Sequence, residues 1–210
     1  MIKAVLFDVD GTLLDTSEYI YQAFEHSLKS VLGIKLDRSK IREVLGKPLV
    51  QCYEKLVPSQ SISELSFAHK EFQNKNSHLA FAFPNAKETL SKLHQKGLLI
   101  AVITSRARES ATVTLEQAGL MKYIDLFIGI EDVVAPKPDP EGINKALAQF
   151  GILAQEAVMV GDSDVDIMAG KSAGTGTIGV SYGFHGEKIG THNPDKVIKS
   201  LLEILTELNI

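Results

Sequence analysis

The sequence predicts an α/β fold built on a parallel sheet that helices cover on both faces, with a helical segment inserted near its start. Short apolar runs of strand length recur along the chain, at residues 2–7, 98–103, 126–130, 157–160 and 177–180. Helical patterns separate the later runs, and this alternation is typical of a parallel sheet with both faces buried. Residues 15–83 differ, because they carry helical patterns and no convincing strand.

The composition of the whole chain narrows the class of protein. At 210 residues, 44% of them hydrophobic, the chain fits one large domain or one domain with an insertion. The formal net charge is -4, whereas nucleic-acid-binding domains are typically basic, so we expect no nucleic-acid partner. No apolar run reaches the ~18 residues of a spanning helix, so we expect no membrane partner. Cys52 is the single cysteine, which excludes an intrachain disulfide and is compatible with the cytoplasmic location that we expect.

The first apolar run, Ala4 to Phe7, has the pattern of a buried strand and lacks the features of a signal peptide. Asp8 and Asp10 follow it, and the two-residue period of extended chain points both carboxylates to one side just before Gly11. Carboxylates this close repel each other unless a cation lies between them. Mg²⁺ prefers oxygen ligands, so this strand end is a candidate metal site with a carboxylate nucleophile. The alternative is an ordinary polar turn.

The insertion at residues 15–83 is predicted to be helical. Its first helix has apolar residues at i, i+3, i+7 and i+10, which share one face. These residues are Tyr21, Phe24, Leu28 and Val31. Further helices fit near residues 38–45, 48–57 and 61–78. We expect the insertion to lie over the strand-end site, with hinges at residues 15–17 and 81–84; the alternative is that its helices pack on the sheet as ordinary core.

Three helices of the second half are predicted by apolar spacing and by the glycine that ends each of them. Glycine just past a helix end is the expected stop signal. The stops are Gly97, Gly119 and Gly151. The apolar positions are Leu90 and Leu93 in the first helix, Ala111, Leu115 and Ala118 in the second, and Ile143, Leu147 and Phe150 in the third.

The strand predicted at residues 98–103 ends in two hydroxyl residues, Thr104 and Ser105. Hydroxyls and backbone N–H groups at a turn between a strand and a helix can hold a phosphate oxygen. A hydroxyl at this position is also a common helix N-cap, which is the alternative interpretation.

Lys137 lies between Pro136 and Pro138. The prolines restrict the backbone on both sides of the lysine, which suits a cation aimed at one point. The alternative is a solvated lysine in a proline-rich loop.

A second acidic strand end follows residues 158–160. Asp162 leaves this strand, and Asp166 lies one turn into the next helix, so the two carboxylates share a face. Acidic residues at a helix start can simply complement the helix dipole. That alternative does not account for a second carboxylate pair after a second buried strand.

Taken in order, the motifs DxDGT, strand-Thr, Lys-Pro-Asp-Pro and GDSxxD resemble those of the haloacid dehalogenase superfamily of phosphotransferases. The Lys-Pro-Asp-Pro context and the length are most similar to phosphoglycolate phosphatases and their pyrophosphatase relatives. The resemblance implies a Rossmann-like parallel sheet core, formed by residues 1–14 and 84–210, with the first strand central. It also implies that residues 15–83 form an α-helical cap domain.

The resemblance assigns a role to each motif. Asp8 is expected to be the nucleophile, and Asp10 the general acid and then the general base. Gly11 lets the backbone approach the phosphate, while Thr104, Ser105 and Lys137 bind its oxygens. The Mg²⁺ ligands implied are Asp8, the Asp10 carbonyl oxygen and Asp162, with Asp166 supporting them through a metal-bound water or Lys137.

The expected function is hydrolysis of a small phosphorylated metabolite, phosphoglycolate-like, by a Mg²⁺-dependent phosphatase that forms an aspartyl-phosphate. Asp10 favours phosphate esters or anhydrides, because relatives that cleave carbon–halogen bonds lack an aspartate there. An inorganic pyrophosphatase and a β-phosphoglucomutase-like mutase remain alternatives, although residues 104–108 depart from the Ser-x-Ser-x-Asn pattern associated with the mutases. Lys47 resembles a cap-loop residue that meets the leaving group, with a solvated lysine as the alternative. A monomer or a homodimer is compatible with the sequence.

Overall fold

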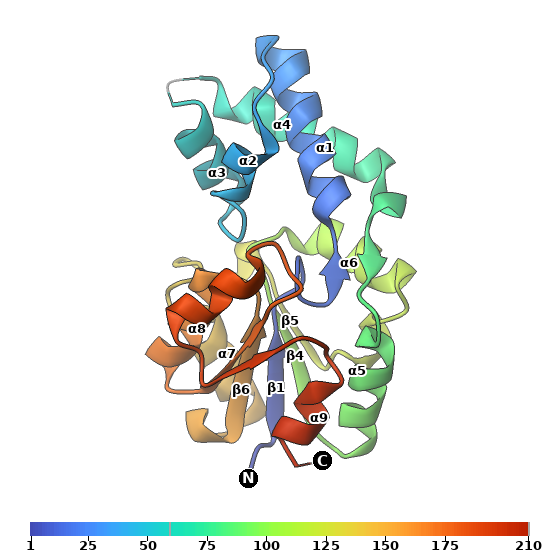
Figure 1. Cartoon of the computed structure of the whole chain (residues 1–210), viewed down its shortest axis with the longest axis vertical. Coiled ribbons are helices and arrows are strands. Elements are labelled where there is room, and N and C mark those ends of the chain that lie inside the picture. Colours follow the sequence, from blue (N-terminus) through green and yellow to red (C-terminus); the bar gives the residue numbers. More distant parts are fainter. Residues whose placement is uncertain (59, 210) are drawn as a thin grey trace.

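The computed structural model describes residues 1–58 and 60–209. Within these ranges six strands form a parallel sheet in the order β5-β4-β1-β6-β7-β8. Figure 1 shows this sheet in the lower part of the molecule, with both chain termini at the end away from the insertion. The strands are β1 (Ala4–Phe7), β4 (Leu99–Ile103), β5 (Leu126–Ile128), β6 (Ala157–Gly161), β7 (Gly176–Val180) and β8 (Lys196–Ile198).

The first strand is central, as expected. Phe7 of β1 is in register with Val102 of β4 on one side and with Val160 of β6 on the other. All four residues of β1 are fully buried, which explains why this strand is a continuous apolar run and not an alternating one. Because the flanking strands run parallel to β1, the residues that follow all three strands meet at one edge of the sheet.

Helices cover both faces of the sheet. On one face α5 (Ala86–Gln95), α6 (Arg108–Gln117) and α9 (Glu203–Glu207) contribute to an apolar cluster with Val5, Phe7 and Val102. On the other face α7 (Glu141–Phe150) and α8 (Asp164–Ala173) pack against Leu6 and Met159. The α/β architecture predicted from the sequence is confirmed. The strand β8 and the helix α9 near the C-terminus were not anticipated.

The segment between β1 and α5 contains α1 (Ser17–Ser27), α2 (Arg38–Arg42), α3 (Leu49–Leu56) and α4 (Ile62–Lys75). A π-helical turn at Leu28–Leu32 extends α1. Figure 1 shows these helices above the edge of the sheet where β1 ends. They have an apolar cluster of their own, which includes Phe24, Ile41, Tyr53 and Leu65. A separate cluster indicates that this segment packs mainly on itself and not on the sheet.

The ends of the insertion differ from the expectation of a segment without strands. Leu14–Asp15 (β2) and Phe81–Ala82 (β3) pair as a short antiparallel ribbon, with Leu14 opposite Ala82. The two predicted hinges therefore lie side by side. A two-residue strand is too short to give an alternating pattern, which is why the sequence did not reveal it.

The remaining short helical turns connect the main elements. They are 3₁₀ segments at Ser77–Leu79, Met121–Tyr123, Ile130–Asp132, Ala154–Glu156 and Gly186–His192. None of the helices formed by residues 1–58 and 60–209 combines the length and apolar character that crossing a bilayer requires.

Candidate active site

Asp8 and Asp162 leave neighbouring strands at the same edge of the sheet. The Asp8 N–H donates to the Val160 carbonyl across the β1–β6 pair, at 3.0 Å. Both carboxylates are buried, with 7% of Asp8 and 1% of Asp162 exposed. The parallel register thus brings together the two acidic strand ends predicted from the sequence.

Lys137 supplies the positive charge of this cluster. Its loop precedes α7, and its buried Nζ donates to Asp8 Oδ1 at 2.7 Å, to Asp166 Oδ1 at 2.6 Å and to the Ile103 carbonyl at 2.8 Å. All three donor hydrogens of the ammonium are therefore used. The lysine predicted from its flanking prolines is aimed at the carboxylates and is not solvated.

Burial dominates the electrostatics of the cluster. It raises the pKa of Asp8 to about 7, with Asp166 and Asp10 adding to the rise and Lys137 opposing it. Burial, Asp166 and Asp8 also raise the pKa of Asp162. Burial opposes the charged form of Lys137, but the adjacent Asp166 and Asp8 carboxylates outweigh it and raise the pKa of Lys137. When Asp8, Asp162 and Asp166 are all ionised, the carboxylates carry more negative charge than one ammonium balances, so a further cation would stabilise their ionised forms.

The geometry fits a hard divalent metal ion at this point. Asp8, Asp162 and Asp166 each offer a carboxylate oxygen, and these oxygens lie within 4.8 Å of one another. Asp166 has less free capacity than the other two, because Oδ1 accepts from Lys137 and Oδ2 accepts from the Ser163 N–H and hydroxyl. A buried set of oxygen ligands is the donor chemistry of Mg²⁺.

Gly11 and Gly183 allow the backbone to approach Asp162. A Cβ on Gly11 would lie 2.3 Å from Asp162 Oδ2, and one on Gly183 would lie 2.4 Å from the Asp162 Cβ. Gly11 also has a φ of +82°, which disfavours any other residue. The Phe184 N–H donates to Asp162 Oδ2 at 2.7 Å and helps to fix this carboxylate. Gly183 and Phe184 were missed in the sequence, because no motif marks residues 181–184.

Thr104 and Ser105 follow β4 at the same edge. The Thr104 N–H donates to the Ile128 carbonyl, and its Oγ1 accepts from the Arg106 N–H at 3.2 Å. The Ser105 hydroxyl is buried and has no hydrogen-bond partner in the part of the chain that the structure describes. This turn therefore holds a hydroxyl donor that the described residues leave unused.

Arg106 is the main residue that the sequence did not single out. Its Nη1 donates to Asp10 Oδ1 at 3.1 Å, and its Nη2 donates to the Tyr19 hydroxyl at 2.9 Å. Nε donates to the Ser110 hydroxyl, and the guanidinium lies over the Tyr19 ring at 4.8 Å from its centre. Arg106 thus links the second aspartate of the first motif to α1 of the insertion.

A cavity of about 400 Å³ lies between the insertion and the sheet edge, lined by Asp8, Asp10 and Arg106 from the core. Lys47, half-buried, lines it from the loop between α2 and α3, so the structure brings this predicted residue to the site. A Cβ on the adjacent Gly46 would lie 3.1 Å from the Ser163 Oγ, which shows how closely this loop approaches the core.

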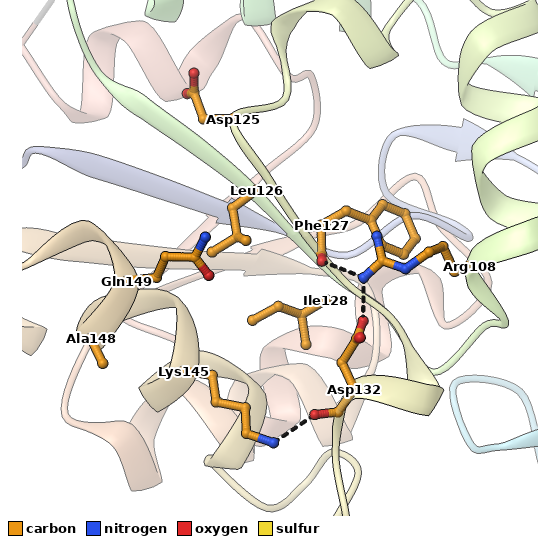
Figure 2. A pocket seen from close by; sticks show the side chains of 9 residues that line it. All are labelled: Arg108, Asp125, Leu126, Phe127, Ile128, Asp132, Lys145, Ala148 and Gln149. Carbon is orange, nitrogen blue, oxygen red and sulfur yellow. Dashed lines mark hydrogen bonds and ion pairs between the residues drawn. The ribbon is translucent and has the colours of Figure 1, made fainter.

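A larger hollow, of about 660 Å³, lies away from the carboxylates at the edge strand β5. Figure 2 shows Arg108 donating to the Phe127 carbonyl and to Asp132, while Lys145 donates to the Asp132 carbonyl. Arg108 thus occupies the Phe127 carbonyl, a backbone acceptor of the edge strand β5. A charged side chain at this position disfavours pairing of β5 with a strand of another molecule. The buried charged cluster, and not this hollow, is the candidate active site.

Comparisons with known proteins agree with this geometry. A family model described as haloacid dehalogenase-like hydrolase matches residues 5–180. Pyrophosphatase PpaX of Halalkalibacterium halodurans is 33% identical over 205 residues, which are 97% of this chain and 95% of that protein. Pyrophosphatase PpaX of Bacillus velezensis is 31% identical over 206 residues, again 97% and 95%. The crystal structure of a predicted phosphoglycolate phosphatase from Haemophilus somnus has a TM-score of 0.91 at 24% identity, over 99% of this chain and 98% of that one, and shows the fold alone.

Proposed function

The chain belongs to the haloacid dehalogenase-like hydrolase family, and from this premise we propose that it is a Mg²⁺-dependent phosphohydrolase acting on small phosphorylated metabolites. The observation that carries the proposal is the buried cluster in which Lys137 contacts Asp8 and Asp166 beside Asp162. Asp8, the Asp10 carbonyl and Asp162 would hold the metal, and Asp166 would orient Lys137. When bound, Mg²⁺ supplies positive charge that keeps Asp8 ionised and neutralises phosphate oxygens.

The proposed reaction proceeds in two steps on this chain's own residues. Asp8 Oδ attacks phosphorus, the bond from phosphorus to the leaving oxygen breaks, and Asp10 gives that oxygen a proton. Water then attacks the phosphorus of the aspartyl-phosphate, and Asp10 takes its proton. The bond from phosphorus to Asp8 Oδ breaks, which regenerates the Asp8 carboxylate and releases inorganic phosphate. Lys137 and the hydroxyls of Thr104 and Ser105 stabilise the charge on the phosphoryl oxygens.

We propose further that residues 15–83 act as a cap domain on a core of residues 1–14 and 84–210. The separate apolar cluster of the insertion and the paired strands at its base support this division. A cap that closes over the cavity would exclude water and present Lys47 to the leaving group.

Two substrate classes fit the cations around the cavity. A small acidic monoester such as phosphoglycolate is the first candidate, because Arg106 and Lys47 line the space beyond Asp8. Inorganic pyrophosphate is the second candidate. It is favoured by the relatives named pyrophosphatase, which this chain matches over 95% of their length.

A substrate panel tests the proposal. The purified protein is assayed with p-nitrophenyl phosphate, phosphoglycolate and pyrophosphate, with Mg²⁺ and after chelation, alongside Asp8→Asn. Turnover that requires both Mg²⁺ and Asp8 is expected, and kcat/KM ranks the substrates. Turnover in Asp8→Asn equal to that of the unmodified protein would contradict the proposed function.

A further inference from the structure

The helix α4 of the insertion presents a polar stripe to the cavity. The residues that line it recur with the spacing of one helix face, at i, i+3, i+4, i+7 and i+8. They are Ser66, His69, Lys70, Gln73 and Asn74. A helix packed on its own domain has no need of buried polar groups on this face, and the Ser66 hydroxyl is buried without a partner among the described residues.

His69 is the most deeply buried polar side chain of the stripe, with 2% exposed. Its ring packs edge-on against Phe24, with centres 4.6 Å apart, and against Tyr53. Its Nδ1 lies 2.9 Å from the Tyr53 hydroxyl. Nε2 takes part in none of the hydrogen bonds formed within residues 1–58 and 60–209, although the ring lines the cavity shared with Asp8 and Asp10.

A chain of hydrogen bonds leads from Ser27 through Tyr53 to this ring. The Ser27 hydroxyl lies 3.0 Å from the Phe24 carbonyl, and when it donates there, Ser27 Oγ accepts from the Tyr53 hydroxyl. The single hydrogen of Tyr53 is then used, and its oxygen accepts from Nδ1–H of His69. This arrangement, in which Nε2 is an unprotonated acceptor, is part of the proposal that follows. Burial lowers the pKa of His69 to about 3, with Arg106 and Lys70 adding to the effect, so the ring is neutral at physiological pH.

We propose that His69 Nε2 accepts a hydrogen bond from the leaving group, and that the protein therefore prefers phosphate compounds whose leaving group carries an O–H donor. Alcohol hydroxyls and a singly protonated phosphate have this donor, whereas the carboxylate of phosphoglycolate has acceptors only. Of the two substrate classes proposed above, the inference therefore favours pyrophosphate, and among monoesters it favours those that carry a hydroxyl over phosphoglycolate. Arg106 and Lys47 can only donate hydrogen bonds and so favour the anionic acceptors of a substrate, whereas neutral His69 would offer an acceptor and favour a donor. This inference rests on the proposed function.

A matched pair of substrates measures the preference. Glycerol 3-phosphate and n-propyl phosphate share a carbon chain and differ in hydroxyls. The unmodified protein should show a kcat/KM ratio of about tenfold or more in favour of glycerol 3-phosphate, the effect of one hydrogen bond. His69→Phe keeps an aromatic ring between Phe24 and Tyr53 but has no acceptor, and its ratio should fall to about one.

Matched variants and a spectrum complete the test. His26→Phe alters an exposed histidine of α1 that packs on Phe72, outside the lining of the cavity, and should keep the ratio. Tyr53→Phe removes the hydroxyl partner of Nδ1, which in the proposed arrangement favours the Nδ1–H tautomer, and should give an intermediate ratio. On the unmodified protein, ¹⁵N NMR should report Nδ1 protonated and Nε2 unprotonated in His69.

The outcomes separate the two proposals. Asp8-dependent turnover with no hydroxyl preference, or with a preference that persists in His69→Phe, overturns the inference and leaves the proposed function standing. A protonated Nε2 also overturns the inference, whatever the folding of the variants. Absence of Asp8-dependent turnover overturns both.

Discussion

Burial decides the chemistry of the individual side chains in this site. The same loss of solvent that raises the pKa of Asp8 lowers that of His69, because in each case the charged form loses hydration. Lys137 stays charged because two carboxylates contact its ammonium. Contacts with other protein groups thus replace water around each group that remains charged.

The neutral state of His69 predicts a dependence of stability on pH. The folded pKa is about 3 and the ordinary value is 6.5, so below pH 6.5 only the unfolded chain gains this proton. His69 therefore stabilises the fold fully above pH 6.5, and this contribution is lost as the pH falls. Between pH 7.5 and 5.5, urea unfolding should show the unmodified protein losing about 1.4 kcal/mol more than His69→Phe. Parallel losses in the two proteins would contradict the assignment.

The contact between Gly11 and Asp162 leads us to expect that a larger residue at position 11 displaces the Asp162 carboxylate. Gly11→Ala would place a methyl group 2.3 Å from Asp162 Oδ2, whereas Gly97→Ala shares the positive φ but meets nothing within 4 Å. Both variants should lose about 1–2 kcal/mol of stability from the left-handed backbone. Only Gly11→Ala should lower kcat/KM, on the order of 100-fold, because it displaces a carboxylate of the site. Equal activity of the two variants would show that Asp162 can shift without consequence.

At the scale of the elements, the ends of the parallel strands position the core side of the site. Asp8, Thr104 and Asp162 follow β1, β4 and β6, so their meeting follows from the parallel topology. These positions were predictable because each follows a clear apolar run. Arg106 was not predictable, because its partner Tyr19 lies 87 positions earlier and no local pattern links them.

Arg106 connects the insertion to the core and contacts Asp10. We therefore expect the effect of its substitution on kcat/KM to depend on the leaving group. Arg106→Gln removes the charged partner of Asp10, so kcat/KM for an alkyl phosphate should fall roughly 10–100-fold. The fall should be smaller for p-nitrophenyl phosphate, whose leaving group needs less help from a general acid, and Arg106→Lys should recover part of the activity. Tyr19→Phe removes only the contact with α1 and should cost less than Arg106→Gln. An equal loss on both substrates would mean that Arg106 does not act through Asp10.

At the scale of the whole molecule, the helical insertion and the sheet edge line one charged cavity. The alternation of strands and helices predicted the sheet, and the absence of long strands between residues 15 and 83 predicted the helices above it. The position of the polar face of α4 in the cavity could not be predicted from the sequence, because its residues match a solvent-exposed helix face equally well. Only the packing of α4 against α1 and α3 distinguishes a cavity wall from a surface.

Metal binding predicts a change in the stability of the whole protein. Mg²⁺ would relieve the repulsion among Asp8, Asp162 and Asp166, so it should raise the unfolding temperature. At one hundred times its Kd, the free energy of unfolding should rise by about 2.7 kcal/mol. Chelation should remove both this gain and the activity. Asp162→Asn should lose the Mg²⁺ response, and Ca²⁺ should replace Mg²⁺ poorly because it prefers longer bonds and more ligands. A melting temperature that does not change when Mg²⁺ is added would contradict the proposed metal site.

The proposed mechanism requires that Asp8 becomes covalently phosphorylated during turnover. In a single turnover quenched with acid, borohydride reduction converts an aspartyl-phosphate into homoserine, which mass spectrometry locates in the peptide. Homoserine is expected at position 8, dependent on substrate and Mg²⁺ and absent from Asp8→Asn. Turnover at full rate with no modification at Asp8, or with the modification at another carboxylate, would contradict it.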